Sequence, residues 1–439
     1  MLFALLFVVY LFGLNRTGVL GPDEPRYAAI GRQMAASGDF VAPVLWGKPW
    51  FEKPPLLYWM TAAATRAGFG LELSPRIPVA LLGWGFIVFL WWIAKREVGP
   101  EAALYAACIL GTSALWIAYS FVAVTDIPLS ATFCAAMLIA LYRRGTRWAC
   151  AAGVLLGLAV LAKGLVPLVL FFPLLWPLRR RVRELTLLGV CCLLIAAPWY
   201  IAMAVRFGSP FLSDFFWKQH FQRFATAALA HVRPWWFYVP VLLGAIFPWT
   251  PAYLLMRRDP RVPFLAAWLI YAFIFFSASQ NKLPGYMLPL LPPLCLMLGV
   301  ALERASKPAK WVLGTSAFLA GTLPAVAVAV PEALRQGLTH IHFAPPWWTL
   351  VVAVVVAVPV LLLRNRFFAV TALSCAAILY IKVTLTPELD RSVSARRTWY
   401  ETKPSCIPAR VDRDMEYGMK YYANRELPRC SESSILYRE

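Results

Sequence analysis

The chain has 439 residues, of which 60% are hydrophobic and 15% charged, and its mean hydropathy is +0.64. A soluble globular protein of this length needs far more charged surface, so that class is excluded. The formal net charge of +20 would suggest nucleic acid binding in a soluble protein. Here the basic residues lie in short breaks between long apolar runs, so we also exclude a nucleic acid partner.

Long apolar segments predict an all-α integral membrane protein with about 13 transmembrane helices. The predicted spans are residues 2–14, 77–94, 102–119, 124–142, 148–162, 164–178, 185–205, 236–256, 262–279, 283–301, 311–330, 347–363 and 367–383. We interpret residues 1–383 as one membrane domain and residues 384–439 as a small domain outside the membrane. No basic flank precedes the first span, so we expect the natural start to lie several residues upstream.

The basic residues of the breaks alternate along the chain, which fixes the predicted topology. The breaks assigned to the inside carry Lys95-Arg96, Arg143-Arg144, Arg179-Arg180-Arg181, Arg257-Arg258, Arg304 with Lys307, and Arg364 with Arg366. The outside breaks are short and nearly uncharged, apart from two longer segments. This alternation predicts an inside N-terminus and an outside C-terminus, and it would fail if residues 148–178 formed a single span.

The first long outside segment, residues 15–76, contains the signals of a short helix. Acidic residues followed by Pro at position 25 favour a helix start, and Gly38 favours its end. Three apolar residues fall on one face of this helix, at Tyr27, Ile30 and Met34. We therefore expect the helix to lie in the membrane interface.

The second long outside segment, residues 206–235, is rich in aromatic side chains mixed with Lys218, His220 and Arg223. This composition also predicts an interfacial helix. The polar tail, residues 384–439, contains Cys406 and Cys430, and whether these two form a disulfide stays open at this point. The other cysteines lie in apolar runs and are interpreted as buried residues.

Charged residues that face outside next to membrane spans are costly unless they are used. The first loop concentrates them at Asp23, Glu24 and Arg26, followed by Glu52-Lys53. The alternative for Asp23 and Glu24 is the favourable placement of acids at a helix start. The alternative for Glu52-Lys53 is a surface ion pair, although the two prolines that follow make a floppy loop less plausible.

Four further positions have both a functional and a structural interpretation. Asp126 can act in catalysis or cap a helix, and an unpaired Lys163 can bind an anion or snorkel to the interface. His220 with Arg223 can belong to a site or decorate an interfacial helix. Lys282 can belong to a site or be a charged loop residue.

Six motifs occur in order along the chain, and together they are specific. They are Asp23-Glu24-Pro-Arg26-Tyr27, Phe51-Glu52-Lys53-Pro-Pro, Thr125-Asp126-Ile-Pro, Ala162-Lys163-Gly164, His220-Phe-Gln-Arg223-Phe, and Ser279-Gln-Asn-Lys282-Leu-Pro-Gly-Tyr286-Met-Leu-Pro. Over about residues 1–300 the chain resembles the GT-C membrane glycosyltransferases of the protein-mannosyltransferase superfamily. Within that superfamily it is most similar to the lipid A aminoarabinose transferases.

The resemblance implies a bacterial inner-membrane enzyme with thirteen spans and a periplasmic active site. It implies transfer of a sugar from a polyprenyl (undecaprenyl) phosphate donor to a lipid or glycan acceptor, with aminoarabinose transfer to lipid A as the leading interpretation. The tail is shorter than we expect in the lipid A enzymes, which leaves the acceptor open. The alternatives are a protein O-mannosyltransferase or polysaccharide-modifying GT-C enzyme, a transporter, and a catalytically inactive homologue.

Site residues follow from the resemblance position by position. Asp23 matches the essential acidic residue of the first outside loop, and Asp126 matches a second one. The residues implied at the donor phosphate are Lys53, Lys163 and Arg223. The residues implied to line the substrate cavity are Glu24, Arg26, Tyr27, Lys282 and Tyr286. A divalent metal is the one cofactor considered, with Glu52 and His220 as its candidate ligands.

Overall fold

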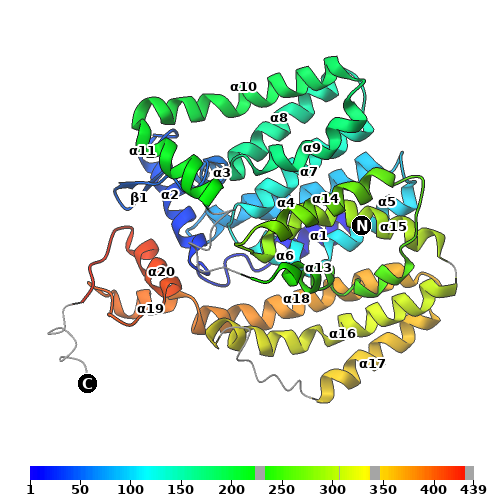
Figure 1. Cartoon of the computed structure of the whole chain (residues 1–439). Helices are drawn as coiled ribbons and strands as arrows, with labels where there is room; N and C mark the ends of the chain where they lie inside the picture. The colour runs from blue at the N-terminus through cyan, green and yellow to red at the C-terminus, as the bar shows by residue number, and fades with distance from the viewer. Residues whose placement is uncertain (223–232, 306, 337–346, 431–439) are drawn as a thin grey trace.

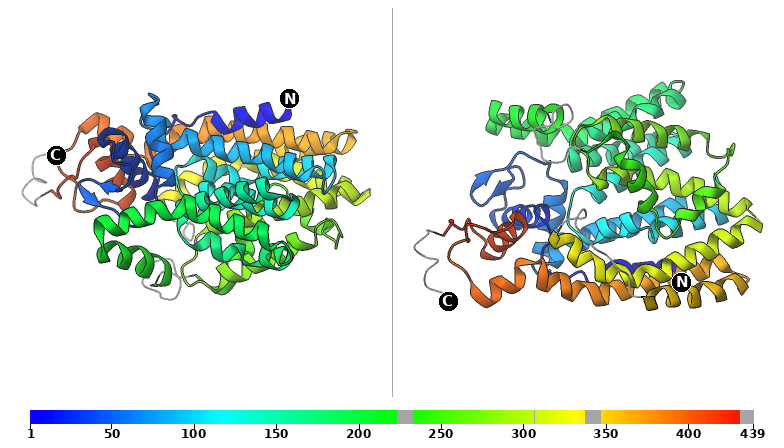
Figure 2. Two further views of the ribbon diagram at one scale, coloured as in Figure 1. Left: turned by 90° about the horizontal axis from the view of Figure 1, so that it is seen from above. Right: turned by 60° about the horizontal axis from the view of Figure 1, so that its bottom comes forward.

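The computed structural model describes residues 1–222, 233–305, 307–336 and 347–430, and within these ranges the protein is almost entirely helical (Figure 1). The long axis of the molecule is set by helices that run roughly side by side (Figures 1 and 2). They are α1 (Leu2–Leu11), α4 (Leu73–Ala94), α5 (Pro100–Gly111), α6 (Ala114–Phe121), α7 (Asp126–Tyr142), α8 (Thr146–Lys163), α9 (Val166–Leu178), α10 (Val182–Phe207), α13 (Tyr238–Ala245), α14 (Pro263–Ala278), α15 (Leu291–Arg304), α16 (Lys307–Gln336), α17 (Trp347–Leu362) and α18 (Arg366–Ser392). Short 3-10 helices flank some of them, at η2 (Trp235–Phe237), η3 (Thr250–Leu255) and η4 (Pro284–Leu290).

Five of these helical segments are long and apolar enough to cross a membrane, which confirms an all-α, multi-pass membrane architecture. They are residues 73–94, 146–163, 182–207, 284–304 and 366–392. A sixth span results if α5 and α6 are counted as one broken span, since they are bent by 54°. The remaining predicted spans coincide with shorter apolar helices or with α16, so the count of thirteen stays a prediction.

Two of the predicted spans are not continuous helices. The span predicted at 102–119 breaks at Thr112-Ser113, because Ser113 is extended and the amide of Ala114 bonds to the carbonyl of Phe247 (3.0 Å). The span predicted at 236–256 is divided into η2, α13 and η3. Proline removes the backbone donor that a continuous helix needs, and Pro248 lies between α13 and η3.

The predicted break between residues 162 and 164 is confirmed. Helix α8 ends at Lys163, and Gly164 follows with φ +79°, a conformation that L side chains rarely adopt. Helix α9 then starts at Val166. The two short apolar segments are therefore separate helices.

The elements outside the helical bundle gather at one end of it (Figure 1). They are α2 (Asp23–Ser37), the hairpin β1 (Val44–Leu45) and β2 (Lys48–Pro49), α3 (Leu56–Arg66), α11 (Ser209–Leu212), the π-helix η1 (Ser213–Gln222), α19 (Ala395–Thr402) and α20 (Arg413–Ala423). Helix α2 has the predicted bounds: it is ended by Gly38 with φ +75°, and Tyr27, Ile30 and Met34 are buried along one face. In the second outside segment, α10 continues to Phe207 before the chain turns into α11 and η1.

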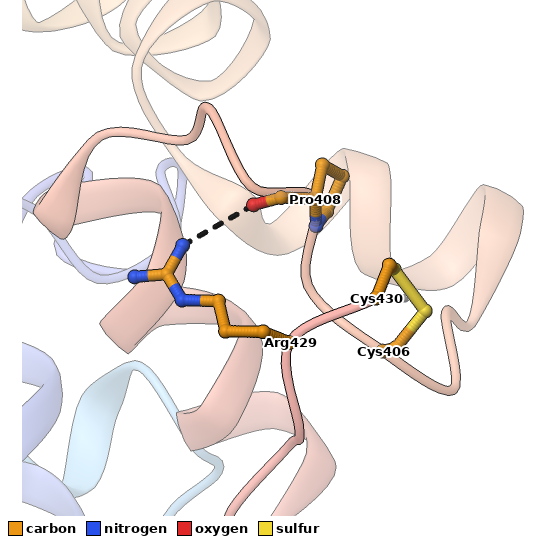
Figure 3. The surroundings of a disulfide bond; sticks show 4 residues. All are labelled: Cys406, Pro408, Arg429 and Cys430. Atoms are coloured by element: carbon orange, nitrogen blue, oxygen red, sulfur yellow. Dashed lines mark hydrogen bonds between the residues drawn. A yellow bond between two sulfur atoms is a disulfide. The ribbon is translucent and has the colours of Figure 1, made fainter. Parts of the chain in front are cut away.

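Residue 384, where the C-terminal domain is predicted to start, lies within helix α18. Helix α18 continues to Ser392 because its buried stripe continues past 383, with Leu385 and Leu389 packed inside at helical spacing. The small domain beyond it is closed by a disulfide between Cys406 and Cys430 (Figure 3). The backbones of Ile407 and Arg429 pair beside this disulfide. The Arg429 side chain also donates a hydrogen bond to the carbonyl of Pro408 (3.2 Å), which supports the same closure.

The C-terminal domain packs against the first outside loop. The Tyr421 hydroxyl donates to the carbonyl of Leu71 (2.8 Å), and Arg32 of α2 donates to the carbonyl of Tyr421 (2.6 Å). The Tyr422 hydroxyl accepts from the amide of Val19 (3.2 Å). These buried contacts join α20 to α2, which are almost at opposite ends of the sequence but side by side in Figure 1.

Candidate active site

A charged cluster at the start of α2 brings the first two outside motifs together around Arg26. The Nε of Arg26 donates to the carbonyl of Pro22 (2.8 Å), and the two terminal nitrogens contact Asp23 and Glu52, the latter at 3.4 Å. The other Glu52 oxygen lies 3.1 Å from Nζ of Lys53. Asp23 is 43% exposed, whereas the other three side chains are largely buried. The accessible carboxylate of the cluster is therefore that of Asp23.

Burial and charge act in opposite directions on the basic centre of this cluster. Burial lowers the pKa of Arg26, but the neighbouring carboxylates of Glu52 and Asp23 more than offset it, so the pKa is raised overall. Burial, followed by the same two carboxylates, raises the pKa of Tyr27 well above its usual value. Tyr27 is thus a neutral phenol inside the protein, only 2% exposed.

Glu24 does not line a substrate cavity, contrary to its predicted role. Its side chain is fully buried, and both oxygens bind the guanidinium of Arg76 at 2.7 Å. The same carboxylate accepts from the amides of Leu20 (2.6 Å) and Ala123 (2.8 Å). Because Ala123 lies three residues before Asp126, Glu24 fastens the loop that carries Asp126 to the helix that carries Asp23.

Arg76 is the partner that sequence reasoning missed. It is fully buried and also donates to three carbonyls of the first loop, those of Leu14, Thr17 and Gly18, at 2.7–2.8 Å. The signal was its position one residue before a predicted span, where an unpartnered arginine would be costly.

A second cluster forms where α7 begins and α8 ends. Asp126 is the first residue of α7 and Lys163 is the last residue of α8, and their charged atoms are 2.6 Å apart. Lys163 was expected to be unpaired, so this ion pair corrects that expectation. Each charge also suits its helix end, because a helix dipole favours an acid at the N-terminus and a base at the C-terminus. Nζ of Lys163 lies 4.8 Å from the ring centre of Tyr286, a cation–π contact.

Tyr119 of α6 belongs to the second cluster, and sequence reasoning also missed it. A Cβ placed on Gly285 would lie 2.6 Å from the Tyr119 ring and 2.7 Å from a carboxylate oxygen of Asp126. The ring and the carboxylate therefore meet over the bare backbone of Gly285. Tyr119 also lies within electrostatic reach of both Asp126 and Asp23. The bend between α5 and α6 brings this residue to the site, and nothing local in the sequence indicates it.

Lys282 is not placed as a substrate contact. It is buried, and its ammonium group donates to the carbonyls of Ser279 and Arg233, the latter at 3.3 Å. It is therefore not a solvated loop residue either. Its two hydrogen bonds connect the loop before η4 to the segment before η2.

Two predicted site residues cannot be placed. Arg223 lies outside the described residues. His220 belongs to η1, but its side chain also lies outside them. Among the described residues, no group of three or more His, Cys, Asp and Glu side chains is arranged to hold a metal ion. Each carboxylate oxygen of Glu52 lies beside a cation, Arg26 or Lys53. The metal site of Glu52 and His220 stays a prediction.

Comparison with known proteins places the chain in a family. Residues 52–201 match the family model described as dolichyl-phosphate-mannose-protein mannosyltransferase. The chain is 36% identical over 338 residues to the undecaprenyl phosphate-alpha-4-amino-4-deoxy-L-arabinose arabinosyl transferase of Pseudomonas aeruginosa (strain UCBPP-PA14), covering 71% of this chain and 60% of the relative. It is 32% identical to the protein of the same name from Serratia proteamaculans (strain 568), covering 79% of this chain and 67% of the relative.

Among solved structures, the fold is similar to that of ArnT from Cupriavidus metallidurans bound to undecaprenyl phosphate. The TM-score is 0.79 at 26% identity, covering 98% of this chain and 85% of that one. Fold and site together define a multi-pass membrane protein of the GT-C glycosyltransferase class. More narrowly, the chain belongs to the family of undecaprenyl phosphate-aminoarabinose arabinosyl transferases. It spans about 60% of the length of the first curated relatives that it matches.

Proposed function

We propose that this protein transfers 4-amino-4-deoxy-L-arabinose from undecaprenyl phosphate to lipid A at the periplasmic face of the bacterial inner membrane. The names of the relatives support the donor, and a structural relative was solved with undecaprenyl phosphate bound. The single observation that carries the proposal is the cluster of Asp23, Arg26, Glu52 and Lys53, which joins two motifs of the first outside segment at one end of the bundle. An exposed carboxylate beside buried cations suits displacement of a lipid phosphate.

The reaction breaks the bond between the anomeric carbon and a phosphate oxygen, and forms a bond from that carbon to an acceptor oxygen. The electron pair of the broken bond leaves with undecaprenyl phosphate, and Lys53 stabilises the charge that the phosphate gains. Lys163, held by Asp126, and Arg223 are the further candidates for phosphate contact. Asp23 accepts the acceptor's proton, or orients an acceptor phosphate and offsets positive charge at the anomeric carbon.

The proposal also includes the finer architecture. Thirteen crossings with an inside N-terminus would put the charged clusters and the C-terminal domain in the periplasm. That domain would begin after Ser392 and would help to form the acceptor site. The disulfide between Cys406 and Cys430 supports a periplasmic location of this domain, because disulfides persist in oxidising compartments such as the periplasm.

The function is tested by expressing the protein in a strain that lacks its own aminoarabinose transferase but makes the donor. Mass spectrometry of lipid A should show the added amino sugar. If lipid A is unchanged and a surface polysaccharide or protein gains a sugar instead, the proposed class of donor is retained and lipid A is rejected as the acceptor. If no glycan changes, the transferase proposal is overturned.

The catalytic role of Asp23 is tested by Asp23→Asn. Asn has no carboxylate charge and cannot take up the acceptor's proton, so we expect transfer to fall by at least about 100-fold, within the range ascribed to general acid–base catalysis. The melting temperature should stay at the wild-type value, because Asn can still serve at a helix start. Asp39→Asn in the same outside loop is the matched control and should transfer normally. Transfer by Asp23→Asn within a few-fold of wild type would move the catalytic role to Asp126.

A further inference from the structure

The guanidinium of Arg26 lies between two aromatic rings from distant parts of the chain. Its central carbon is 5.2 Å from the ring centre of Trp50 and 5.1 Å from that of Tyr417. Trp50 belongs to the first outside loop, directly after the β1–β2 hairpin. Tyr417 belongs to α20 of the C-terminal domain. The domain that was least certain from the sequence therefore reaches the centre of the charged cluster.

The tip of the hairpin is built to meet the same tyrosine. Trp46 and Gly47 form the two-residue turn of the hairpin, with φ +47° and +84°. Positive φ is rare for a bulky side chain and is found where surrounding contacts hold it. The Trp46 ring is stacked on Tyr417, with ring centres 5.8 Å apart and planes 30° apart. Lys420, about one helical turn further along α20, lies over the Trp46 ring, 5.4 Å from its centre.

We propose that Tyr417 is a positioning residue of the active site: it fixes the plane of Arg26, and through Arg26 it fixes Asp23 and Glu52. The inference rests on the proposed function of this site. A planar guanidinium presents its donors in one fixed fork, so the plane that the two rings set decides which carboxylates it can reach. Asp23 is the most exposed member of the cluster, and Arg26 is its charged partner, so its carboxylate depends on this restraint.

The C-terminal domain then acts on catalysis without supplying a reacting group. The disulfide between Cys406 and Cys430 closes the segment that contains α20. That helix is fixed on α2 by the bond from Arg32 to Tyr421, and on the chain around α2 by the bonds of Tyr421 to Leu71 and of Tyr422 to Val19. Tyr417 lies on the same helix, one turn before them. The packing of α20 therefore determines where the Tyr417 side chain lies relative to Arg26.

The test compares Tyr417→Ala, Tyr417→Leu and Tyr417→Phe with a matched control, Tyr400→Ala. Tyr400 lies in the same domain on α19, is 56% exposed and has no described contact with the cluster. We expect Tyr417→Ala and Tyr417→Leu to lower kcat about tenfold while the donor KM changes less than about threefold, because the restraint acts on the reacting geometry. Tyr417→Phe keeps the ring and should retain wild-type kcat. Tyr400→Ala should be unchanged.

Three outcomes would overturn the inference. An unchanged kcat in both Tyr417→Ala and Tyr417→Leu would show that the ring does not position Arg26. A loss of kcat in Tyr417→Phe equal to that in Tyr417→Ala would assign the effect to the hydroxyl group. Equal losses in Tyr400→Ala and Tyr417→Ala, with equal falls in melting temperature, would show only that the domain must be folded.

A second measurement separates this inference from the proposed function. Hydrogen–deuterium exchange of the peptide that contains residues 20–30 needs no sugar acceptor. We expect faster exchange in Tyr417→Ala and Tyr417→Leu than in wild type, and wild-type exchange in Tyr417→Phe. If the wild-type protein does not modify lipid A but the exchange pattern holds, the acceptor is wrong and the positioning role stands. If the exchange of all variants equals wild type, the positioning role fails even in an active enzyme.

Discussion

At the scale of single residues, Asp23 and Glu24 are neighbours in sequence with opposite environments. Asp23 is partly exposed beside Arg26, whereas Glu24 is fully buried against Arg76. Burying both charges of the Glu24–Arg76 pair is tolerated because every oxygen of the carboxylate and every nitrogen of the guanidinium has a bonding partner. The helix start thus supplies one accessible acid and one buried structural acid.

This difference predicts the behaviour of Glu24→Gln. The change leaves the charge of Arg76 buried without its counter-charge, which costs roughly 3–5 kcal/mol of unfolding free energy. The melting temperature in detergent should fall clearly, while the protein that stays folded transfers sugar. Asp23→Asn is the matched variant with the reverse pattern: normal melting and no transfer. An unchanged melting temperature with lost transfer in Glu24→Gln would return Glu24 to a substrate contact.

At the scale of elements, short irregular pieces bring the second cluster together. Helix α6 is turned away from α5 at Thr112-Ser113, and η4 runs past it so closely that only a glycine fits between Tyr119 and Asp126. A continuous helix over residues 100–121 would carry Tyr119 along the direction of α5. The break is therefore part of how the site is built.

Gly285→Ala tests this arrangement. The added Cβ would lie 2.6 Å from the Tyr119 ring and 2.7 Å from Asp126, so one of them must move. Misplacing a site group by a fraction of an ångström to 1 Å lowers kcat by roughly ten- to 100-fold, and overpacking costs about 1–3 kcal/mol of stability. Gly189→Ala, on the open side of α10 where a Cβ meets nothing within 4 Å, is the control and should keep full activity. Normal kcat in Gly285→Ala would show that the Asp126 cluster takes no part in transfer.

At the scale of the whole molecule, the two ends of the helical bundle differ in the elements and the charged residues that they carry. Helix α2, the hairpin, α19 and α20 gather at one end (Figure 1), while the predicted topology assigns the basic breaks that contain Arg143 and Arg181 to the inside. Arg181 and Arg143 are fastened there by bonds to the carbonyls of Ala140 and Ile93. Such a molecule has one orientation in a membrane under the positive-inside rule.

The orientation is tested with reporters fused after Glu439. A periplasm-active reporter should work and a cytoplasm-active one should be silent, because an odd number of crossings puts the C-terminus opposite an inside N-terminus. The reciprocal fusions after Arg258, in a predicted inside break, are the control and should give the reverse pattern. A cytoplasm-active signal at Glu439 would remove the periplasmic site and the proposed mechanism with it.

The sequence by itself determined the features that depend on neighbouring residues. Long apolar runs require a membrane, alternate basic breaks predict the topology, and Asp23 with Gly38 delimits α2 because helix ends need local partners. The same holds for the break at Gly164, where only glycine adopts the backbone conformation easily. The family motifs also contained both candidate acids, Asp23 and Asp126.

The tertiary structure alone decided which charges meet. Glu24 pairs with Arg76, and Asp126 pairs with Lys163, in each case between two separate helices. Tyr417 contacts Arg26, although almost the whole chain separates them in sequence. Sequence spacing does not predict such pairs, because they depend on how the helices pack, on the bend between α5 and α6, and on the continuation of α18 to Ser392. An acid at a helix start looks the same whether it faces solvent or a buried arginine, and only the packing around it separates the catalytic candidate from the structural residue.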